Sequence, residues 1–395
     1  MDILFVTPWF PYPATNGARV RSSKLLAALA AAGHRCHLFA FEPPPESAPG
    51  PYPDLSSVSF TASWKSHRPG RLVSTLALLA PTPRYFRLVY QPELFEQIRQ
   101  AALERRADVV IAYEMAAGDY VARLTDGRVV KILDGCEPFA FQSTHATLRS
   151  LARIWKFKRF LRSMLNRFDA YIAVSDAELS WIRQEVAPRH AWGCTVPNGT
   201  DLSDAYVGPV DGQRIIYTGS LTYRANLETV DYFLAEIWPA IRRAQPRATF
   251  VVTGERPDQE TARRLEAVPG VSLAGLLTDY QRFVSSSAVL AAPLLRGGGT
   301  RIKVLEAFAL GCPVVATPKA VEGLQVSPGQ DVLVAGTPAE FASAVLSVMR
   351  DGSLRRSLID NGRRTATGYS WVRAQASFVE VTARCLEQRA FVHPA

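Results

Sequence analysis

The chain has 395 residues, which is enough for two domains of ordinary size rather than one. Hydrophobic residues make up 48% of it and charged residues 21%, and this balance excludes an intrinsically disordered protein. The formal charge of +9 favours anionic partners, namely nucleic acid, an acidic membrane surface or phosphorylated substrates. The alternative is a basic, solvated surface with no specific partner.

The cysteines and the apolar segments indicate where in the cell the protein is located. Five widely spaced cysteines form no Cys-x-x-Cys pair, which argues against a disulfide framework or a zinc site and favours a reducing cytoplasm. No segment has the pattern of a signal peptide, and none reaches the roughly 18 apolar residues that span a bilayer. The sequence therefore predicts a cytoplasmic protein, either soluble or peripheral on the inner membrane face.

Short apolar runs alternate with amphipathic stretches of helical length along the whole chain, a pattern typical of parallel sheets with crossover helices. In the first half, a helix is predicted at about 20–32 and strands at 3–6, 36–41, 109–112, 129–133, 171–174 and 195–196. In the second half, strands are predicted at 215–217, 249–253, 271–274, 289–293, 314–316 and 332–334. We expect an α/β protein with two doubly wound parallel-sheet domains.

Turn-forming residues are concentrated between the two series of strands, from Pro197-Asn198-Gly199 to Asp211-Gly212. This pattern predicts a linker between a first domain at 1–200 and a second domain at 201–370.

The stretch from Arg149 to Phe168 carries seven basic residues and no acidic one, and its apolar residues recur at helical spacing. The pattern predicts an amphipathic helix packed on the first domain. A second interpretation is contact with a membrane surface or a lipid phosphate.

The most informative segment is 291–310, where an apolar strand leads through Gly297-Gly298-Gly299 directly into a helix. Glycines allow close backbone approach to a ligand, and a helix start offers N–H groups and a partial positive charge. Arg301 and Lys303 add cations there, which costs about 0.3–1 kcal/mol each unless an anion is bound. The segment predicts a phosphate site, with a tight turn bearing two solvated bases as the alternative.

Glu306 lies in the same helix between apolar neighbours, and a carboxylate in such surroundings needs partners. A ribose diol can donate two hydrogen bonds to it. A salt bridge to a neighbouring Arg or Lys is the alternative.

Asp134 and Glu137 follow a strand end, where ligands of parallel sheets lie, so they are candidates for contacts with an acceptor or a sugar, or for turn and capping roles. No Asp-x-Asp motif and no histidine spacing predicts a metal site, so Arg and Lys would neutralise a bound phosphate instead. No Gly-x-Gly-x-x-Gly follows the first strand, which disfavours a dinucleotide oxidoreductase.

The segment GGGTRIKVLEAFALGCPVVA at 297–316 resembles the donor-site signature of glycosyltransferase family 4, with Glu306 at the second carboxylate of that family's E-x7-E pattern. Other segments that resemble the family are VPNGTD at 196–201, YTGSL at 217–221 followed by Asn226, and YSW at 369–371. The N-terminal residues 7–21 resemble the acceptor-side loop of a subgroup of sugar transferases from exopolysaccharide biosynthesis.

The resemblance implies a GT-B fold, in which two Rossmann-like domains face each other across a cleft and a helix at about 371–395 packs back on the first. It implies an enzyme of the hexosyltransferase type that transfers a sugar, with retention, from a nucleotide-diphosphate sugar to a glycan or lipid-linked acceptor. No cofactor or metal and no nucleic acid would be needed, and an anionic membrane surface is a further partner to consider.

The resemblance also implies roles for individual residues. Glu306 would hold the ribose, and Leu276 would lie beside the base. The remaining donor-binding residues would be Gly219, Arg224, Gly298, Gly299, Thr300, Arg301 and Lys303. Gly17 and Arg21 would lie on the acceptor side, and the candidates for catalytic contacts are Asp134, Glu137 and Arg224.

Two positions depart from the family pattern. Gly298 replaces the first carboxylate of E-x7-E, and the basic residue expected after the first strand of the second domain has Arg224 as its nearest substitute. We therefore expect backbone N–H groups and acids of the first domain to hold the sugar. The alternatives are a GT-B sugar-nucleotide epimerase, which needs no acceptor, and a non-catalytic regulator that binds a nucleotide or polysaccharide.

Overall fold

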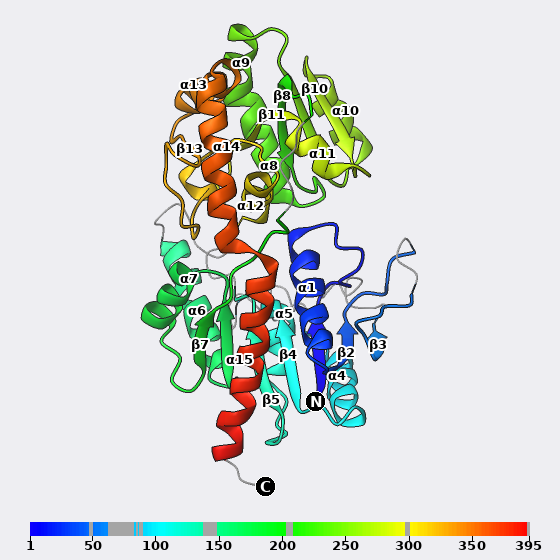
Figure 1. The fold of residues 1–395 in the computed structure, drawn as a ribbon. Coiled ribbons are helices and arrows are strands. Elements are labelled where there is room, and N and C mark those ends of the chain that lie inside the picture. Colours follow the sequence, from blue (N-terminus) through cyan, green and yellow to red (C-terminus); the bar gives the residue numbers. More distant parts are fainter. Residues whose placement is uncertain are drawn as a thin grey trace. The chain divides into compact units, whose positions relative to one another are not determined.

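The computed structural model describes residues 1–46, 50–61, 83, 86, 90–136, 148–202, 208–296 and 301–392, except for the side chains of 148–150 and 389–392. The chain divides into two compact units (Figure 1). The first unit is Met1–Pro197 with Ala374–Ala395, and the second is Asn198–Arg373. The sequence places these boundaries at 200/201 and at about 371.

The first unit is built on a parallel sheet of seven strands in the order β3-β2-β1-β4-β5-β6-β7. Its strands are β1 (Asp2–Thr7), β2 (Arg35–Ala40), β3 (Ser57–Phe60), β4 (Val109–Tyr113), β5 (Val130–Asp134), β6 (Ala170–Ala173) and β7 (Trp192–Thr195). The chain runs from β1 outward to β3 and then returns to the other side of β1. The carboxyl ends of β1 and β4 therefore form a topological switch point, where α/β sheets bind ligands.

The helices of the first unit include α1 (Gly17–Ala31), α4 (Pro92–Glu104), α5 (Glu114–Val121), α6 (Leu148–Leu165), α7 (Asp176–Trp181) and the π-helical turn η3 (Ile182–Val186). The predicted amphipathic helix is confirmed, because α6 buries Phe157, Leu161, Met164 and Leu165. The last helix, α15 (Trp371–Val392), begins in the second unit and belongs to the first unit from Ala374 onward. There it packs on α1, where Gln375 Nε2 donates to the Lys24 carbonyl at 2.7 Å.

The second unit has a parallel sheet of six strands in the order β10-β9-β8-β11-β12-β13. The strands are β8 (Asp211–Thr218), β9 (Thr249–Thr253), β10 (Val271–Gly275), β11 (Ser287–Ala292), β12 (Val314–Ala316) and β13 (Leu333–Val334). Its α-helices are α8 (Arg224–Tyr232), α9 (Trp238–Ala244), α10 (Gln259–Glu266), α11 (Tyr280–Ser285), α12 (Ile302–Ala309), α13 (Pro338–Arg350) and α14 (Gly352–Ala366). The shorter turns are the π-helical η4 (Phe233–Ile237) and the 3₁₀ turns η5 (Pro318–Ala320) and η6 (Thr367–Tyr369). The switch point of this sheet lies between β8 and β11.

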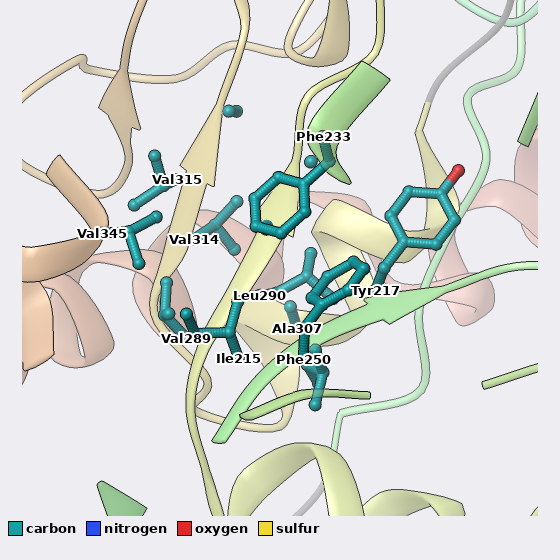
Figure 2. Packing of buried hydrophobic residues seen from close by; sticks show 14 of the residues in the cluster. Ile215, Tyr217, Phe233, Phe250, Val289, Leu290, Ala307, Val314, Val315 and Val345 are labelled. Atoms are coloured by element: carbon teal, nitrogen blue, oxygen red, sulfur yellow. The ribbon is translucent and has the colours of Figure 1, made fainter. Parts of the chain in front are cut away.

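The core of the second unit anchors the helix that follows this switch point. Figure 2 shows Val289 and Leu290 of β11 packed among aromatic and branched side chains, with Ala307 of α12 in the same cluster. Each such large apolar side chain contributes roughly 1.5–3 kcal/mol when fully buried. Tyr217 of β8 lies at the edge of the cluster, and its hydroxyl oxygen points away from the other labelled side chains (Figure 2).

Two expectations about strands need correction. The edge strand β3 is absent from the predicted set, because its four residues alternate Ser with Val58 and Phe60 and none of them is fully buried. Asp211 and Gly212, which the sequence places in the linker, form the start of β8.

Candidate functional site

The ends of β8 and β9 approach each other closely beside the switch point of the second sheet. Gly219 follows β8 with φ +150°, and Gly254 follows β9 with φ +119°. A Cβ atom on Gly254 would lie 2.6 Å from the carbonyl carbon and oxygen of Gly219. Only glycine allows both this backbone conformation and this approach, so a side chain at Gly254 would force the ends of β8 and β9 apart.

Lys303 of α12 extends its amine across the end of β8. Its Nζ lies 3.9 Å from the centroid of the Tyr217 ring and 3.3 Å from Asn226 Oδ1. A Cβ atom on Gly219 would lie 3.1 Å from the same Nζ. Burial, and next the charge of Arg301, lower the pKa of Lys303 to about 7, while Glu306 opposes the shift. A cation held in this way gains from a bound anion, which would compensate for its lost hydration.

Asn226 is the side chain that fixes this arrangement. The Tyr217 hydroxyl donates to Asn226 Oδ1 at 2.7 Å, and Asn226 Nδ2 donates to the Ser220 carbonyl at 2.8 Å. The amide therefore turns its oxygen toward both Tyr217 and Lys303. The sequence marks Asn226 through the family resemblance alone and gives no sign of its contact with Tyr217.

Glu306 lies half-buried one turn along α12 from Lys303 and accepts a hydrogen bond from the Tyr280 hydroxyl, at 3.1 Å from its Oε2. Burial raises the pKa of Glu306 to about 7, the charge of Asp201 raises it further, and Tyr280 and Lys303 lower it. Within the described parts of the chain Glu306 forms no ion pair, contrary to the salt-bridge alternative. Tyr280 engages Oε2, which leaves Oε1 for a hydroxyl donor.

The other predicted donor residues that the structure describes differ in how exposed their side chains are. Arg301 is buried at the start of α12, and its charge acts on Lys303. Arg224 begins α8 with its side chain 89% exposed and bonded to Glu228 at 2.8 Å. Leu276 follows β10 and is 60% exposed. The remaining predicted residues, Gly298, Gly299, Thr300 and Glu137, lie outside the described residues.

In the first unit, Arg21 and Asp134 form a buried ion pair. Arg21 Nε donates to Asp134 Oδ2 at 2.8 Å, and Arg21 Nη2 donates to Asp134 Oδ1 at 2.6 Å and to the Val196 carbonyl at 3.0 Å. Asp134 and Arg21 are both buried and bonded to each other, and their catalytic and acceptor-side contacts stay predictions. The pair joins α1 to the ends of β5 and β7. Gly17, the other predicted acceptor-side residue, is the first residue of α1, which is capped by Asn16.

A different pair lies at the switch point of the first sheet. Trp9, in the loop after β1, donates from Nε1 to Glu114 Oε2 at 3.0 Å. Glu114 follows β4 directly and has φ +64°, a strained conformation for a residue with a side chain. Such strain is concentrated at functional sites. Sequence reasoning missed Glu114, although a carboxylate directly after a buried strand is the signal that could have found it.

The described residues contain no group of three or more His, Cys, Asp or Glu side chains that could hold a metal ion.

Comparison with known proteins identifies the family. A model described as Glycosyltransferase Family 4 matches residues 15–204, and a model described as Glycosyl transferases group 1 matches residues 212–351. The chain belongs to the family 4 glycosyltransferases. It is therefore an enzyme that transfers a sugar from a nucleotide sugar.

Relatives and solved structures agree with this assignment. A phosphatidyl-myo-inositol mannosyltransferase of Mycobacterium leprae is 22% identical over 308 residues, which cover 72% of this chain and 75% of that protein. Sucrose-phosphate synthase from Thermosynechococcus elongatus superposes with a TM-score of 0.75 at 18% identity, over 98% of this chain and 99% of that one. Anabaena HepE in complex with UDP and glucose superposes with a TM-score of 0.69 at 17% identity, over 97% of this chain and 100% of that one. These likenesses confirm the predicted GT-B fold of two Rossmann-like domains.

No helix in the described part of the chain is both long and apolar enough to cross a membrane.

Proposed function

We propose that the protein is a retaining hexosyltransferase that uses a nucleoside-diphosphate hexose and a glycan or lipid-linked acceptor. The observation that carries the proposal is the placement of Lys303 and Glu306 on one face of α12 at the switch point of the second sheet, beside Gly219. A cation and a carboxylate one helical turn apart match the diphosphate and the ribose of one donor molecule.

The carboxylate suits the ribose because its two oxygens have different surroundings. Tyr280 holds Oε2, which orients the group, and Oε1 accepts from a ribose hydroxyl. Loss of a hydrogen bond to a charged group costs about 1.5–3 kcal/mol.

The diphosphate is the leaving group, and negative charge develops on it during transfer. Lys303 and Arg301, at the start of α12, stabilise that charge together with the helix N-terminus. Fixed cations of this kind replace the metal ion that an Asp-x-Asp motif would hold.

Relatives support a hexose donor. Anabaena HepE has been seen with UDP-glucose, and a Corynebacterium glutamicum relative, 28% identical over 149 residues, is a GDP-mannose-dependent mannosyltransferase. The matched families and these relatives are transferases, which disfavours the epimerase and the non-catalytic regulator. The Mycobacterium leprae relative is named for a phosphatidylinositol substrate, which favours a lipid-linked acceptor here, presented at an anionic membrane surface.

On the acceptor side, the proposal assigns Trp9 and Glu114 to an acceptor hydroxyl. They lie at the carboxyl ends of β1 and β4, where the first sheet would bind its ligand, and the indole N–H fixes the carboxylate. A carboxylate held in this way accepts the hydroxyl proton in a hydrogen bond and orients the attacking oxygen.

The proposal is tested by screening UDP-, GDP- and ADP-hexoses for thermal stabilisation, and then measuring transfer from the donor that binds. A donor at a hundred times its dissociation constant adds about 2.7 kcal/mol. We expect nucleotide release that depends on acceptor, and a product with the donor's anomeric configuration by NMR. Conversion of the donor without acceptor would favour the epimerase, binding without turnover would favour the regulator, and an inverted product would exclude retention.

We expect transfer to persist in excess chelator, because Lys303 and Arg301 supply the positive charge that a divalent ion would otherwise provide. The measurement is initial rate with and without EDTA at saturating donor. Complete loss of transfer that magnesium or manganese restores would contradict the metal-independent mechanism.

We expect Glu306→Gln to lower nucleoside affinity about tenfold with little effect on thermal stability. In the wild type, nucleoside affinity should rise between about pH 6 and pH 8, because the carboxyl, whose pKa burial raises to about 7, ionises and becomes a better acceptor. The measurement is calorimetric titration with the nucleoside, because a nucleoside has no phosphate for Lys303 to contact. In Glu306→Gln the affinity should not change with pH.

Tyr280→Phe is the matched control, because it removes the orienting hydroxyl and retains the carboxylate. We expect a smaller loss of affinity than in Glu306→Gln, with the pH dependence kept. A rise of nucleoside affinity with pH that survives in Glu306→Gln would assign the titration to another group.

A further inference from the structure

The outward face of α6 carries large apolar side chains that the described residues leave exposed. Leu151 is 55% exposed and Trp155 is 58% exposed, although both belong to a helix whose opposite face is buried. Arg159 and Arg162 are exposed and follow at spacings that place all four residues on one face of the helix. This outward face, defined by Leu151, Trp155, Arg159 and Arg162, is both apolar and strongly basic.

Basic side chains lie beside the two indoles of this region. The Arg159 guanidinium lies 5.6 Å from the Trp155 ring centroid, and Lys158 Nζ lies 5.6 Å from the Trp181 ring. A surface pocket of about 400 Å³ is lined by Trp155, Lys158, Arg159, Arg162 and Glu185. Glu185 pairs with Lys158 and is the one acid among the described lining residues, which therefore keep an excess of positive charge.

Two physical arguments select an anionic bilayer as the occupant of this face. Tryptophan has a large apolar ring and one polar N–H, and it is stable at the level of lipid headgroups, where one end is apolar and the other is wet. Arg and Lys side chains beside it reach lipid phosphates, and a helix with this composition lies in the plane of the interface. A protein partner would need an acidic surface with an apolar centre, and nothing in this face selects that geometry.

We infer that the outward face of α6 docks the protein on an anionic lipid bilayer. Trp155 and Leu151 enter the headgroup region, and Arg159 and Arg162 contact lipid phosphates. The inference extends the proposed function, because such docking brings the enzyme to a lipid-linked acceptor. It does not require that any particular sugar be transferred.

The experiment is co-sedimentation of the full chain with vesicles of phosphatidylcholine, with and without phosphatidylglycerol. We expect binding to the anionic vesicles alone and release at high salt. Leu151→Ser/Trp155→Ser should reduce binding more than tenfold. Arg159→Gln should reduce it about fivefold, the equivalent of one basic residue at an anionic surface.

A matched control lies on α4 of the same unit. Leu103 is 50% exposed and Arg99 is paired with Glu96 at the surface, so Leu103→Ser/Arg99→Gln removes an exposed leucine and an arginine from a face without net basic charge. This variant should bind vesicles as the wild type does. Equal recovery with both vesicle compositions, or an equal loss in the control variant, would overturn the inference.

The outcome is separable from that of the proposed function. Thermal stabilisation by the nucleoside diphosphate reports on ligand binding to the second unit. It should be the same in the wild type, the two docking-face variants and the control variant. Transfer to a soluble glycan without any vesicle binding would support the proposed function and contradict the docking inference. Vesicle binding without nucleotide binding would support the docking inference and contradict the proposed function. Binding to acidic protein or RNA but not to vesicles would assign the face to another partner.

Discussion

Lys303→Met is expected to lower the affinity for the nucleoside diphosphate roughly a hundredfold while leaving the affinity for the nucleoside nearly unchanged. The Lys303 ammonium is held 3.9 Å from the Tyr217 ring centroid and close to Gly219, where a diphosphate at the switch point would lie. Hydrogen bonds to charged groups contribute about 1.5–3 kcal/mol, and each 1.4 kcal/mol corresponds to a factor of ten. The measurement is calorimetric titration with the diphosphate and the nucleoside of the preferred base.

Met is the informative replacement because it keeps an unbranched side chain over the Tyr217 ring and removes only the charge and the donor. Burial lowers the pKa of Lys303 to about 7, so the wild-type protein without ligand is partly uncharged there at neutral pH. A diphosphate favours the charged form of Lys303, so this residue takes up protons on binding near pH 7, whereas Glu306 releases them. The uptake that Lys303 contributes should disappear in Lys303→Met, and this variant should release more protons on binding than the wild type does.

Arg224→Gln is the matched control, because the sequence also predicts Arg224 as a basic donor-binding residue. Its side chain is 89% exposed and already bonded to Glu228, so its loss should change diphosphate affinity less than about threefold. If Arg224→Gln lowers the diphosphate affinity more than Lys303→Met does, the assignment of the diphosphate to Lys303 is wrong and Arg224 is the residue that binds it.

Most of the strands were predictable because a strand with a buried, apolar run is marked by its own residues. Strands β9 and β12 have the predicted bounds, since each is a short apolar run enclosed by turn-forming or polar residues. The edge strand β3 lacks that signal, because Ser57 and Ser59 alternate with its apolar residues and one face remains partly solvated.

The contacts of the site were less predictable, because they join residues distant in sequence. The Gly-rich loop with Lys303 and Glu306 is visible as one contiguous motif. The partner of Glu306 is Tyr280, 26 positions earlier, and their contact depends on how α11 and α12 pack on the sheet. The end of a strand made Asp134 a ligand candidate, but its partner Arg21 lies 113 positions away, and sequence spacing cannot show that the carboxylate is already satisfied.

Gly254→Ala is expected to destabilise the second unit by about 3 kcal/mol and to abolish donor binding at accessible concentrations. The φ of +119° is unfavourable for any residue with a side chain, and strain of this kind costs about 1–3 kcal/mol. The added methyl group would also lie 2.6 Å from backbone atoms of Gly219, which a rotamer change cannot relieve. Relief requires the ends of β8 and β9 to separate, and that movement displaces Gly219 from Lys303.

Gly212→Ala is the matched control, because Gly212 lies in β8 of the same unit and a Cβ atom there would meet nothing within 4 Å. For a unit of this size 1 kcal/mol corresponds to about 2–4 °C. Thermal unfolding of Gly254→Ala should therefore shift down by about 10 °C, with Gly212→Ala close to wild type. The decisive comparison is stabilisation by the nucleotide diphosphate, which should be lost in Gly254→Ala even well below its unfolding temperature. A variant that unfolds earlier but still gains the wild-type stabilisation from ligand would mean that the close approach of the two strand ends serves the fold alone, and that the diphosphate lies elsewhere along the sheet edge.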